Sequence, residues 1–228
     1  PGLRMPAGSN SRLSARCSCS SGPGSGVKTS LPVAPPRKSV ACPPDAVAAA
    51  REGLLVGRIV AVKGLGGFQL ACRADEESAV ARLRERKRRP TKPLAVMVSD
   101  LAHARALASL GEAECALLSS PRSPVVLAPR LDRCPVAPGV APGLDDLGVM
   151  LPTTPLHVEL FRGGTLPPLV MTSGNLSEEP ICRGNREALE RLGGVADLFL
   201  LHDRDVVRRV DDSVVRATPI GLVVVRRA

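Results

Sequence analysis

The stretch that decides the fold is RIVAVKGLGGFQLACRADEESAVARLRERKRRPTKPLAVMV, residues 58–98. It opens with a short apolar run, residues 58–62, whose β-branched residues predict a buried strand. Lys63-Gly64-Leu65-Gly66-Gly67 follows, and its glycines allow backbone angles and a close ligand approach that other residues do not. A predicted helix, a basic loop and a second strand come next. This order suits a site that holds a phosphorylated ligand.

The helix is predicted from Asp75 as its N-cap, acidic residues in its first turn and an apolar face that includes Leu83. It runs into residues 84–92, where six of nine residues are basic, and a second apolar run lies at 94–98. Glycine turns after strands are common, and a run of charges is usually a solvated face. The glycine spacing fits neither the dinucleotide fingerprint nor the P-loop. A phosphate site and a plain turn therefore both stay open.

Composition excludes several classes of protein. Hydrophobic residues make up 44% of the 228 residues but aromatic residues only 1%, so we expect a core of Leu, Val, Ile and Ala. Base-stacking platforms for single-stranded nucleic acid need aromatic side chains. No apolar run approaches the ~20 residues of a membrane span. The seven cysteines are scattered without a CxxC pair, which indicates neither a disulfide framework nor a zinc site and fits a cytoplasmic location.

The positive charge is unevenly distributed. The net charge is +9. Residues 1–41 contain six basic residues and no acidic one, and the rest of the chain contains 25 basic and 22 acidic residues. A nearly balanced body favours a local cationic pocket over a nucleic-acid-binding surface. Residues 1–43 are rich in Ser, Gly, Pro and Arg. We predict a disordered or unrelated leader there and one domain over residues 44–228.

The rest of the chain alternates predicted helices and strands. Helices are predicted at 45–56, 100–110, 112–118, 155–161 and 185–192, with Asp45, Asp100 and Asn185 as N-caps of the first, second and last. Strands are predicted at 124–127, 148–151, 168–171, 198–201, 206–210, 213–217 and 222–226. Residues 129–147 read as a long loop. The pattern is typical of an α/β fold with a mixed sheet.

A second candidate site follows the predicted strand at 168–171. Thr172, Ser173 and Asn175 place three polar side chains around Gly174. In α/β sheets, ligands lie outside the carboxyl ends of the strands. An ordinary Asx or Ser turn would use the same residues. Both interpretations stay open on local grounds.

Five segments, in order and spacing, resemble the YrdC-like domain of the HypF carbamoyltransferases of nickel–iron hydrogenase maturation. They are VAVKGLGGFQLAC, ARLRERKRRPTKPLAVM, LGVMLPTTPLH, PLVMTSGNLSEEPI and FLLHDRDVVRRVDDSVVR. The resemblance covers residues 45–228. It implies a YrdC-like α/β fold, with a twisted mixed β-sheet, flanking helices and a cationic concave face.

The resemblance also implies a reaction. The YrdC-like domain of HypF makes carbamoyl-adenylate from ATP, with Mg²⁺, and carbamoyl phosphate or carbamate, and releases pyrophosphate. The carbamoyl group then passes to a HypE-type acceptor protein as a precursor of a cyanide ligand. HypF proteins also have an acylphosphatase-like domain, a zinc segment and a C-terminal transfer domain, which these motifs do not include. The chain is therefore interpreted as a fragment that is incomplete for overall carbamoyl transfer.

Residue roles follow from the same resemblance. The family motif Lys-x-Arg-Pro matches Lys87-Arg88-Arg89-Pro90, and Ser-x-Asn matches Ser173-Gly174-Asn175. The residues expected to be catalytic are Lys63, Lys87 and Arg89. Those expected to bind substrate or nucleotide are Gly64, Gly66, Gly67, Gln69, Lys92, Thr172, Ser173, Asn175, Arg209, Ser213 and Arg226. No protein-bound metal is expected.

Three positions depart from the family, which usually has His, Asp and Tyr there. They are Gln69, Arg73 and Thr153. Gln cannot titrate near neutrality as His can, so Gln69 could replace a hydrogen-bonding His but not a proton-transferring one. Of the histidines, His103 is predicted to lie at the surface. For His157 and His202, packing and a site role are both open.

Other functions compete with the leading one. The same fold could make threonylcarbamoyl-adenylate for tRNA modification, using threonine and bicarbonate. The cationic face and tail could instead form a double-stranded RNA-binding module, and an inactive remnant would keep the fold alone. The leading interpretation requires the basic loop and the Ser-Gly-Asn segment to grip one nucleotide. It therefore requires Lys87 and Asn175 to lie on the same side of the molecule.

Overall fold

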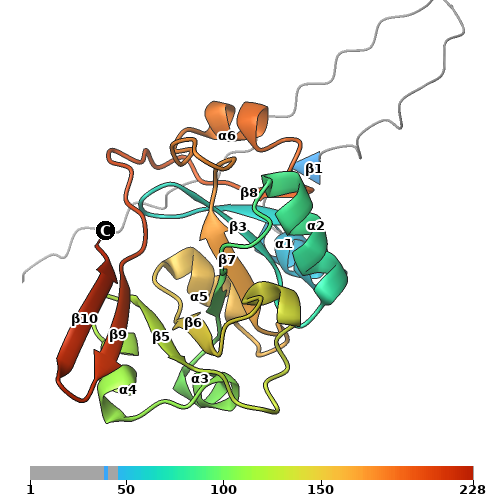
Figure 1. Cartoon of the computed structure of the whole chain (residues 1–228). Helices are drawn as coiled ribbons and strands as arrows, with labels where there is room; N and C mark the ends of the chain where they lie inside the picture. The colour runs from blue at the N-terminus through green and yellow to red at the C-terminus, as the bar shows by residue number, and fades with distance from the viewer. Residues whose placement is uncertain (1–38, 41–45, 228) are drawn as a thin grey trace, which may run out of the picture.

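The computed structural model describes residues 39–40 and 46–227. Within them, one mixed sheet of ten strands runs in the order β1-β8-β2-β3-β7-β4-β6-β5-β9-β10 (Figure 1). The strands are β1 (Ser39–Val40), β2 (Val60–Lys63), β3 (Phe68–Arg73), β4 (Ala95–Met97), β5 (Val125–Pro129), β6 (Asp146–Met150), β7 (Leu169–Ser173), β8 (Leu198–Leu200), β9 (Val214–Thr218) and β10 (Gly221–Arg226). The helices are α1 (Ala46–Leu55), α2 (Glu77–Lys87), α3 (Leu101–Leu107), α4 (Glu112–Leu118), α5 (Pro155–Phe161) and α6 (Asn185–Arg191), with a 3₁₀ turn η1 (Pro138–Val140).

The central strands of the sheet are buried on both faces, whereas β10 is exposed along its length. Along β2 and the residue before it, Ile59 and Ala61 join one apolar cluster while Val60 and Val62 join the other, because successive side chains of a strand point to opposite faces. Helices α2, α3, α4 and α6 contribute to the first cluster, and α1 and α5 to the second. This two-sided burial is why the strands read as continuous apolar runs. It confirms the predicted α/β class.

Strand β3 is the main element that the sequence did not predict. It pairs antiparallel with β2, Lys63 opposite Phe68, so the glycine turn closes a hairpin instead of leading directly to a helix. Its other edge pairs antiparallel with β7. Because β3 is buried on both sides, the alternation of polar and apolar residues that marks a half-exposed strand is missing.

Three helices begin at or next to the residue predicted from the sequence. Helices α4 and α5 occupy the predicted ranges, and Asp100 caps α3 by accepting from the amide of His103. Helix α3 ends at Leu107 instead of residue 110 because Ala108 is extended and bridges to Arg130.

Two predicted N-caps are wrong. Glu76 precedes α2, and the carboxylate of Asp75 pairs instead with the guanidinium of Arg73 at 2.8 Å. Gly184 caps α6, and Asn185 is the first helical residue. Asp45, the third predicted cap, lies outside the described residues.

Residues 206–210 do not form the predicted strand. Val206 is buried, but the segment crosses over the glycine turn, where the amide of Val210 donates to the carbonyl of Gly66 at 3.1 Å. Apolar content alone suggested a strand there. The predicted loop at 129–147 holds η1 and the first two residues of β6.

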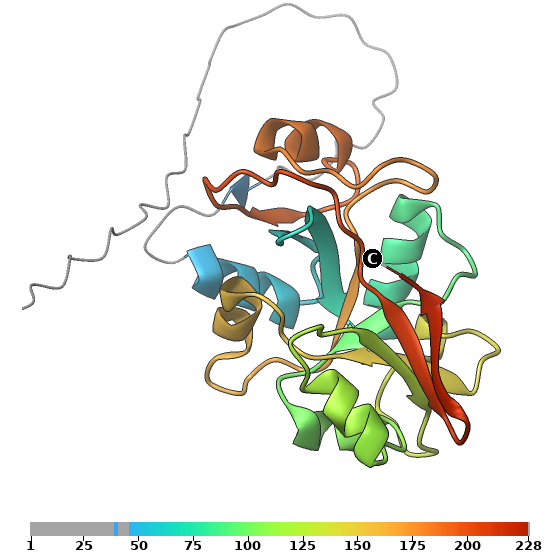
Figure 2. The same cartoon turned by 90° about the vertical axis from the view of Figure 1, so that its left-hand side faces the viewer.

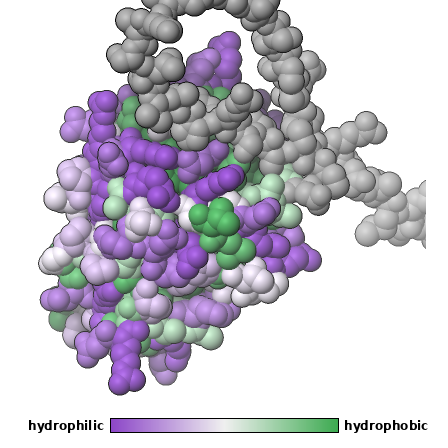
Figure 3. Space-filling view, turned by 90° about the vertical axis from the view of Figure 1, so that its right-hand side faces the viewer, coloured by the Kyte–Doolittle hydropathy of each residue, from purple (hydrophilic) through white to green (hydrophobic). Residues whose placement is uncertain are grey.

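The leader predicted at residues 1–43 lies outside the described residues apart from Ser39 and Val40, which pair in parallel with β8. The β9–β10 hairpin closes the opposite end of the sheet (Figure 2). The face that carries α2 is largely hydrophilic (Figure 3). None of the helices among the described residues is long and apolar enough to cross a bilayer.

Candidate functional site

The Ser-Gly-Asn segment ends β7 beside the start of β3. The amide of Gly174 donates to the carbonyl of Phe68 at 2.6 Å, and a Cβ on residue 174 would lie 2.5 Å from the Cβ of Phe68. Only glycine allows this approach. Beyond it, the hydroxyl of Ser173 donates to Oδ1 of Asn175 at 2.6 Å, and Nδ2 of Asn175 donates to the carbonyl of Glu179. The segment is a tightly fixed turn.

Lys87, the last residue of α2, fixes this turn by hydrogen bonds to Ser173 and Asn175. Its ammonium donates to the carbonyl of Ser173 at 2.5 Å, to the carbonyl of Asn175 at 2.6 Å and to Oδ1 of Asn175 at 2.9 Å. The side chain is 1% exposed. Burial lowers the pKa of Lys87 to about 8, with a further contribution from Arg89. The structure thus brings Lys87 and Asn175 together, but all three ammonium hydrogens have acceptors inside the protein.

The other basic residues of this segment divide into two groups. Arg84 and Arg86 are structural: Arg84 donates to the carbonyls that fold the following loop, and Arg86 pairs with Asp197 at 2.7 Å. Arg89 is half-buried, and its Nε has no partner within the described residues. Lys92 is exposed. Of the basic residues at 84–92, Arg89 is the one that lines a cavity, the larger of the two described below.

The glycine turn is packed as well as bent. A side chain on Gly66 would collide with the carbonyl of Val210, and one on Gly67, whose φ is +143°, would lie 2.5 Å from Ile181. The amide of Gly64 donates to the carbonyl of Gly67 at 2.8 Å. The glycines therefore let residues 181–182 and 210 lie directly against the turn.

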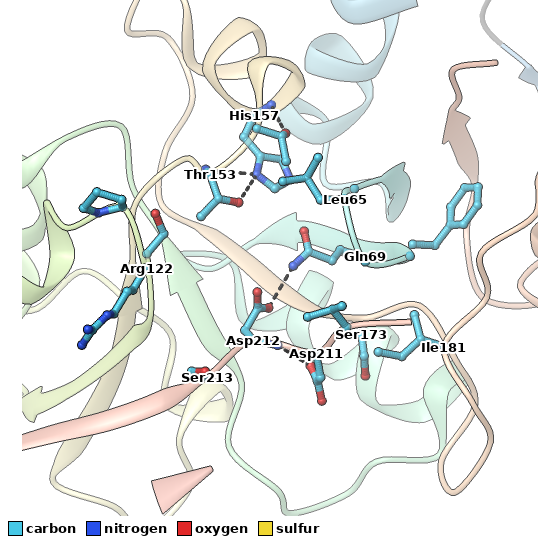
Figure 4. Close-up of a pocket in the computed structure, with 18 residues that line it drawn as sticks. Leu65, Gln69, Arg122, Thr153, His157, Ser173, Ile181, Asp211, Asp212 and Ser213 are labelled. Atoms are coloured by element: carbon cyan, nitrogen blue, oxygen red, sulfur yellow. Dashed lines mark hydrogen bonds between the residues drawn. The ribbon is translucent and has the colours of Figure 1, made fainter. Parts of the chain in front are cut away.

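Two cavities adjoin at the end of β7. The smaller, of about 300 Å³, is lined by the glycine turn, Gln69 and Ser213, and its far wall is formed by Thr153 and His157 (Figure 4). The larger, of about 710 Å³, lies toward β5 and β10 and is lined by Thr172 and by three arginines and four aspartates. These are Arg89, Arg216, Arg226, Asp145, Asp146, Asp211 and Asp212. Ser173, Asp211 and Asp212 line both cavities.

The two aspartates at this boundary are held by Arg226 and Gln69. Arg226 pairs with Asp211 at 2.8 Å and donates to the carbonyl of Asp212. Nε2 of Gln69 donates to Oδ2 of Asp212 at 3.0 Å. Burial raises the pKa of Asp212, and the Asp211 carboxylate raises it further. Neither aspartate is predicted as a site residue from the sequence, although two consecutive acidic residues before a strand are a visible signal.

Several predicted site residues line neither cavity. Lys63 is buried and donates to the carbonyl of His202 at 3.0 Å. Arg209 donates to the carbonyl of Ile181 and approaches Glu187 at 3.3 Å. Lys87 and Asn175 act on the cavities only through Ser173, and Lys92 lies outside them.

The three histidines have different surroundings. His103 is exposed, as predicted. His157 is 1% exposed and lines the smaller cavity. His202 is partly buried and lines neither cavity, and burial lowers its pKa. Among the described residues, no three His, Cys, Asp or Glu side chains are grouped so that they could hold a metal ion.

In this mixed sheet the last residue of α2 is tied to the Ser-Gly-Asn segment at the end of β7. Residues 52–228 match the family described as "Telomere recombination", the Sua5/YciO/YrdC family, and the chain belongs to it. Within this family the chain is similar to HypF. It is 51% identical to the carbamoyltransferase HypF of Rhodobacter capsulatus over 82% of this chain and 24% of that protein. It is 49% identical to HypF2 of Cupriavidus necator over 75% and 23%.

Solved structures also show similarity to HypF and to the fold of the family. Full-length HypF in its phosphate- and nucleotide-bound form is 45% identical, with a TM-score of 0.78 over 82% of this chain and 25% of that one. YciO of E. coli, 16% identical with a TM-score of 0.70 over 84% of this chain and 96% of that one, shares the fold. The chain spans about a quarter of the length of the curated HypF relatives it matches.

Proposed function

We propose that this domain joins carbamate to ATP to form carbamoyl-adenylate. A carbamate oxygen forms a bond to the α-phosphorus of ATP, the bond from that phosphorus to the β-bridging oxygen breaks, and pyrophosphate leaves with the bonding electrons. Phosphorus transfer of this kind depends on positioning and charge neutralisation and needs no nucleophilic side chain. The carbamoyltransferase relatives and the nucleotide-bound HypF structure support the proposal.

The observation that carries it is the meeting of two cavities at Ser173. Ligand sites usually measure about 300–1,000 Å³, so the cavity of about 710 Å³ has room for a nucleotide. The cavity of about 300 Å³ suits a much smaller group. An α-phosphorus bound at the boundary would face a carbamate in the smaller cavity. The reacting atoms would then meet beside the Ser173 hydroxyl.

Each wall has a proposed role. Arg89 and Arg226 would neutralise nucleotide phosphates in the larger cavity, with Thr172 as a further hydrogen-bonding side chain. The amides of the glycine turn other than that of Gly64, and the side chain of Ser213, would face the carbamate. Lys87 and Asn175 would act by fixing Ser173. Lys63, Lys92 and Arg209, which line neither cavity, receive no substrate contact in this proposal.

Mg²⁺ would arrive with ATP. Asp211 and Asp212 supply carboxylate oxygens, the donors that this ion prefers, and phosphate oxygens would complete its ligands. The raised pKa of Asp212 beside Asp211 fits such a cation, since a positive charge would allow both carboxylates to ionise. When bound, the ion would offset charge on the departing pyrophosphate. A HypE-type acceptor, RNA binding and the cytoplasmic location stay predictions.

Carbamate-dependent ATP–pyrophosphate exchange tests the proposal, with ammonium carbamate supplied directly to the full chain. We expect exchange only when carbamate is present, and a loss of about 10- to 100-fold in Arg89→Ala, the effect of one charged contact. Arg186→Ala, at an exposed position on α6, should match the wild type. Formation of ADP instead of AMP would contradict the proposal. Exchange that requires threonine and bicarbonate would favour threonylcarbamoyl-adenylate synthesis.

A further inference from the structure

Two polar atoms of residues that line the smaller cavity are buried and have no hydrogen-bond partner within the part of the chain that the structure describes. They are Nε2 of His157 and Oε1 of Gln69, and both residues line the cavity. Buried polar groups in folded proteins nearly always have partners, because an unsatisfied one costs free energy. Two such atoms on the walls of one cavity indicate a ligand that supplies both partners.

His157 presents a hydrogen-bond donor. Burial lowers the pKa of His157 to about 4, so the imidazole is neutral at physiological pH and carries one hydrogen. The backbone amide of Thr153 donates to Nδ1 at 3.5 Å, and the Thr153 hydroxyl lies 3.3 Å from the same atom. An amide N–H can only donate, so Nδ1 is the acceptor and the ring hydrogen sits on Nε2. The Thr154 hydroxyl caps α5 by accepting from the backbone amide of His157, which holds the backbone of that residue.

Gln69 presents the opposite group. Its Nε2 donates to the carboxylate of Asp212, which fixes the orientation of the side-chain amide and leaves Oε1 as an acceptor. In Figure 4 this oxygen points away from Asp212, toward the side of the cavity where His157 and Thr153 lie. The pairing of Gln69 with Ser173 across β3 and β7 places it at the boundary between the two cavities.

We propose that His157 and Gln69 together recognise the carbamoyl group, with His157 donating to a carbamate oxygen and Gln69 accepting from the carbamate amino group. This inference rests on the proposed function and names the residues that select its small substrate. Carbamate offers both an N–H and an oxygen, whereas acetate, of similar size and charge, offers only oxygen. The cavity should therefore distinguish the two through Gln69, and His157 should bind both.

The test compares the KM for carbamate in ATP–pyrophosphate exchange with the inhibition constant of acetate in the same assay. For the wild type we expect the carbamate KM to be about 10- to 100-fold below the acetate constant, the effect of leaving one buried acceptor unpaired. Gln69→Leu should raise the carbamate KM by about that factor and change the acetate constant by less than about threefold. His157→Phe should raise both by a similar factor.

Two further variants separate recognition from folding. His157→Gln places an amide nitrogen near the position of Nε2 and should restore the carbamate KM to within about fivefold of the wild type if donation is the role of His157. His103→Asn, at an exposed histidine on α3, should change neither constant. Thermal melts of each variant in the absence of substrate report on folding.

The outcomes distinguish the two proposals. If the wild type shows no carbamate-dependent exchange, the proposed function is wrong and this inference falls with it. If exchange occurs but Gln69→Leu raises the carbamate KM and the acetate constant equally, the recognition inference is wrong while the proposed function stands. A His157→Gln protein that folds but behaves like His157→Phe would also overturn the role of His157 as a donor.

Discussion

Replacing Lys87 by methionine should separate stability from activity. The ammonium of Lys87 donates to three oxygens, but two of them keep a donor in the variant. The carbonyl of Ser173 still accepts from the amide of Asn175, and Oδ1 of Asn175 still accepts from the Ser173 hydroxyl. Only the carbonyl of Asn175 loses its partner. One unsatisfied buried acceptor costs about 1–3 kcal/mol.

Loss of the buried charge acts in the opposite direction. The pKa of Lys87 falls from 10.5 to about 8, and each unit corresponds to about 1.4 kcal/mol. The charged side chain therefore costs the folded state about 3 kcal/mol at neutral pH. Since the two effects nearly cancel, Lys87→Met should change the free energy of unfolding by no more than about 2 kcal/mol.

Activity should not be spared in the same way. Without Lys87 the Ser173–Asn175 turn can shift, and a displacement of about 1 Å at a reacting centre can cost about 100-fold. We expect kcat/KM for carbamate-dependent pyrophosphate release to fall by about that factor, while urea denaturation reports nearly unchanged stability.

Arg86→Met is the matched control from the same segment. Breaking the pair of Arg86 with Asp197 should lower stability by about 1–3 kcal/mol and leave kcat/KM within about threefold of the wild type. A Lys87→Met protein that retains kcat/KM within about threefold of the wild type, or whose activity and stability fall in parallel, would refute a positioning role for Lys87.

Three further predictions concern packing, pH and the outlying cations. Gly174→Ala should lower the free energy of unfolding by about 1–3 kcal/mol or more, since its Cβ would meet the backbone of Phe68; circular dichroism melts measure this, and an unchanged melting temperature would contradict the packing. Between pH 8 and 10.5 the folded protein binds fewer protons at Lys87 than the unfolded chain, so wild-type stability should rise with pH relative to Lys87→Met, by up to about 3 kcal/mol. A flat difference across that range would refute the lowered pKa. Arg209→Ala and Lys92→Ala should retain carbamate-dependent ATP–pyrophosphate exchange. A tenfold loss of exchange in either variant would show that the residue does contribute to the site.

The sequence predicted best those features that depend on local chemistry. Helix α5 was found because a proline marks its start, and α4 because it follows the glycine that was predicted to end the preceding helix. The Ser-Gly-Asn turn was found because its polar side chains follow a buried strand. The strand prediction at 206–210 failed because apolar content does not show whether a partner strand lies alongside.

The site could be predicted only in part because a sequence shows charges but not their partners. Lys63 and Lys87 were predicted to act on the substrates, yet both donate to backbone carbonyls of the protein itself. Asp212 became a candidate only when the fold placed it on the wall of the smaller cavity, and for His157, whose site role the sequence left open, the same cavity favours that role. Segments far apart in the chain, on α5, β3 and the approach to β9, meet there. No local pattern encodes that meeting.

A crystal structure of the full chain with a non-hydrolysable ATP analogue would test the central claim most directly. We expect the phosphates to lie beside Arg89 and Arg226 in the larger cavity, with the α-phosphorus next to Ser173 and the smaller cavity open to carbamate. A nucleotide bound at Lys92, at Arg209 or anywhere else away from the junction of the two cavities would contradict it.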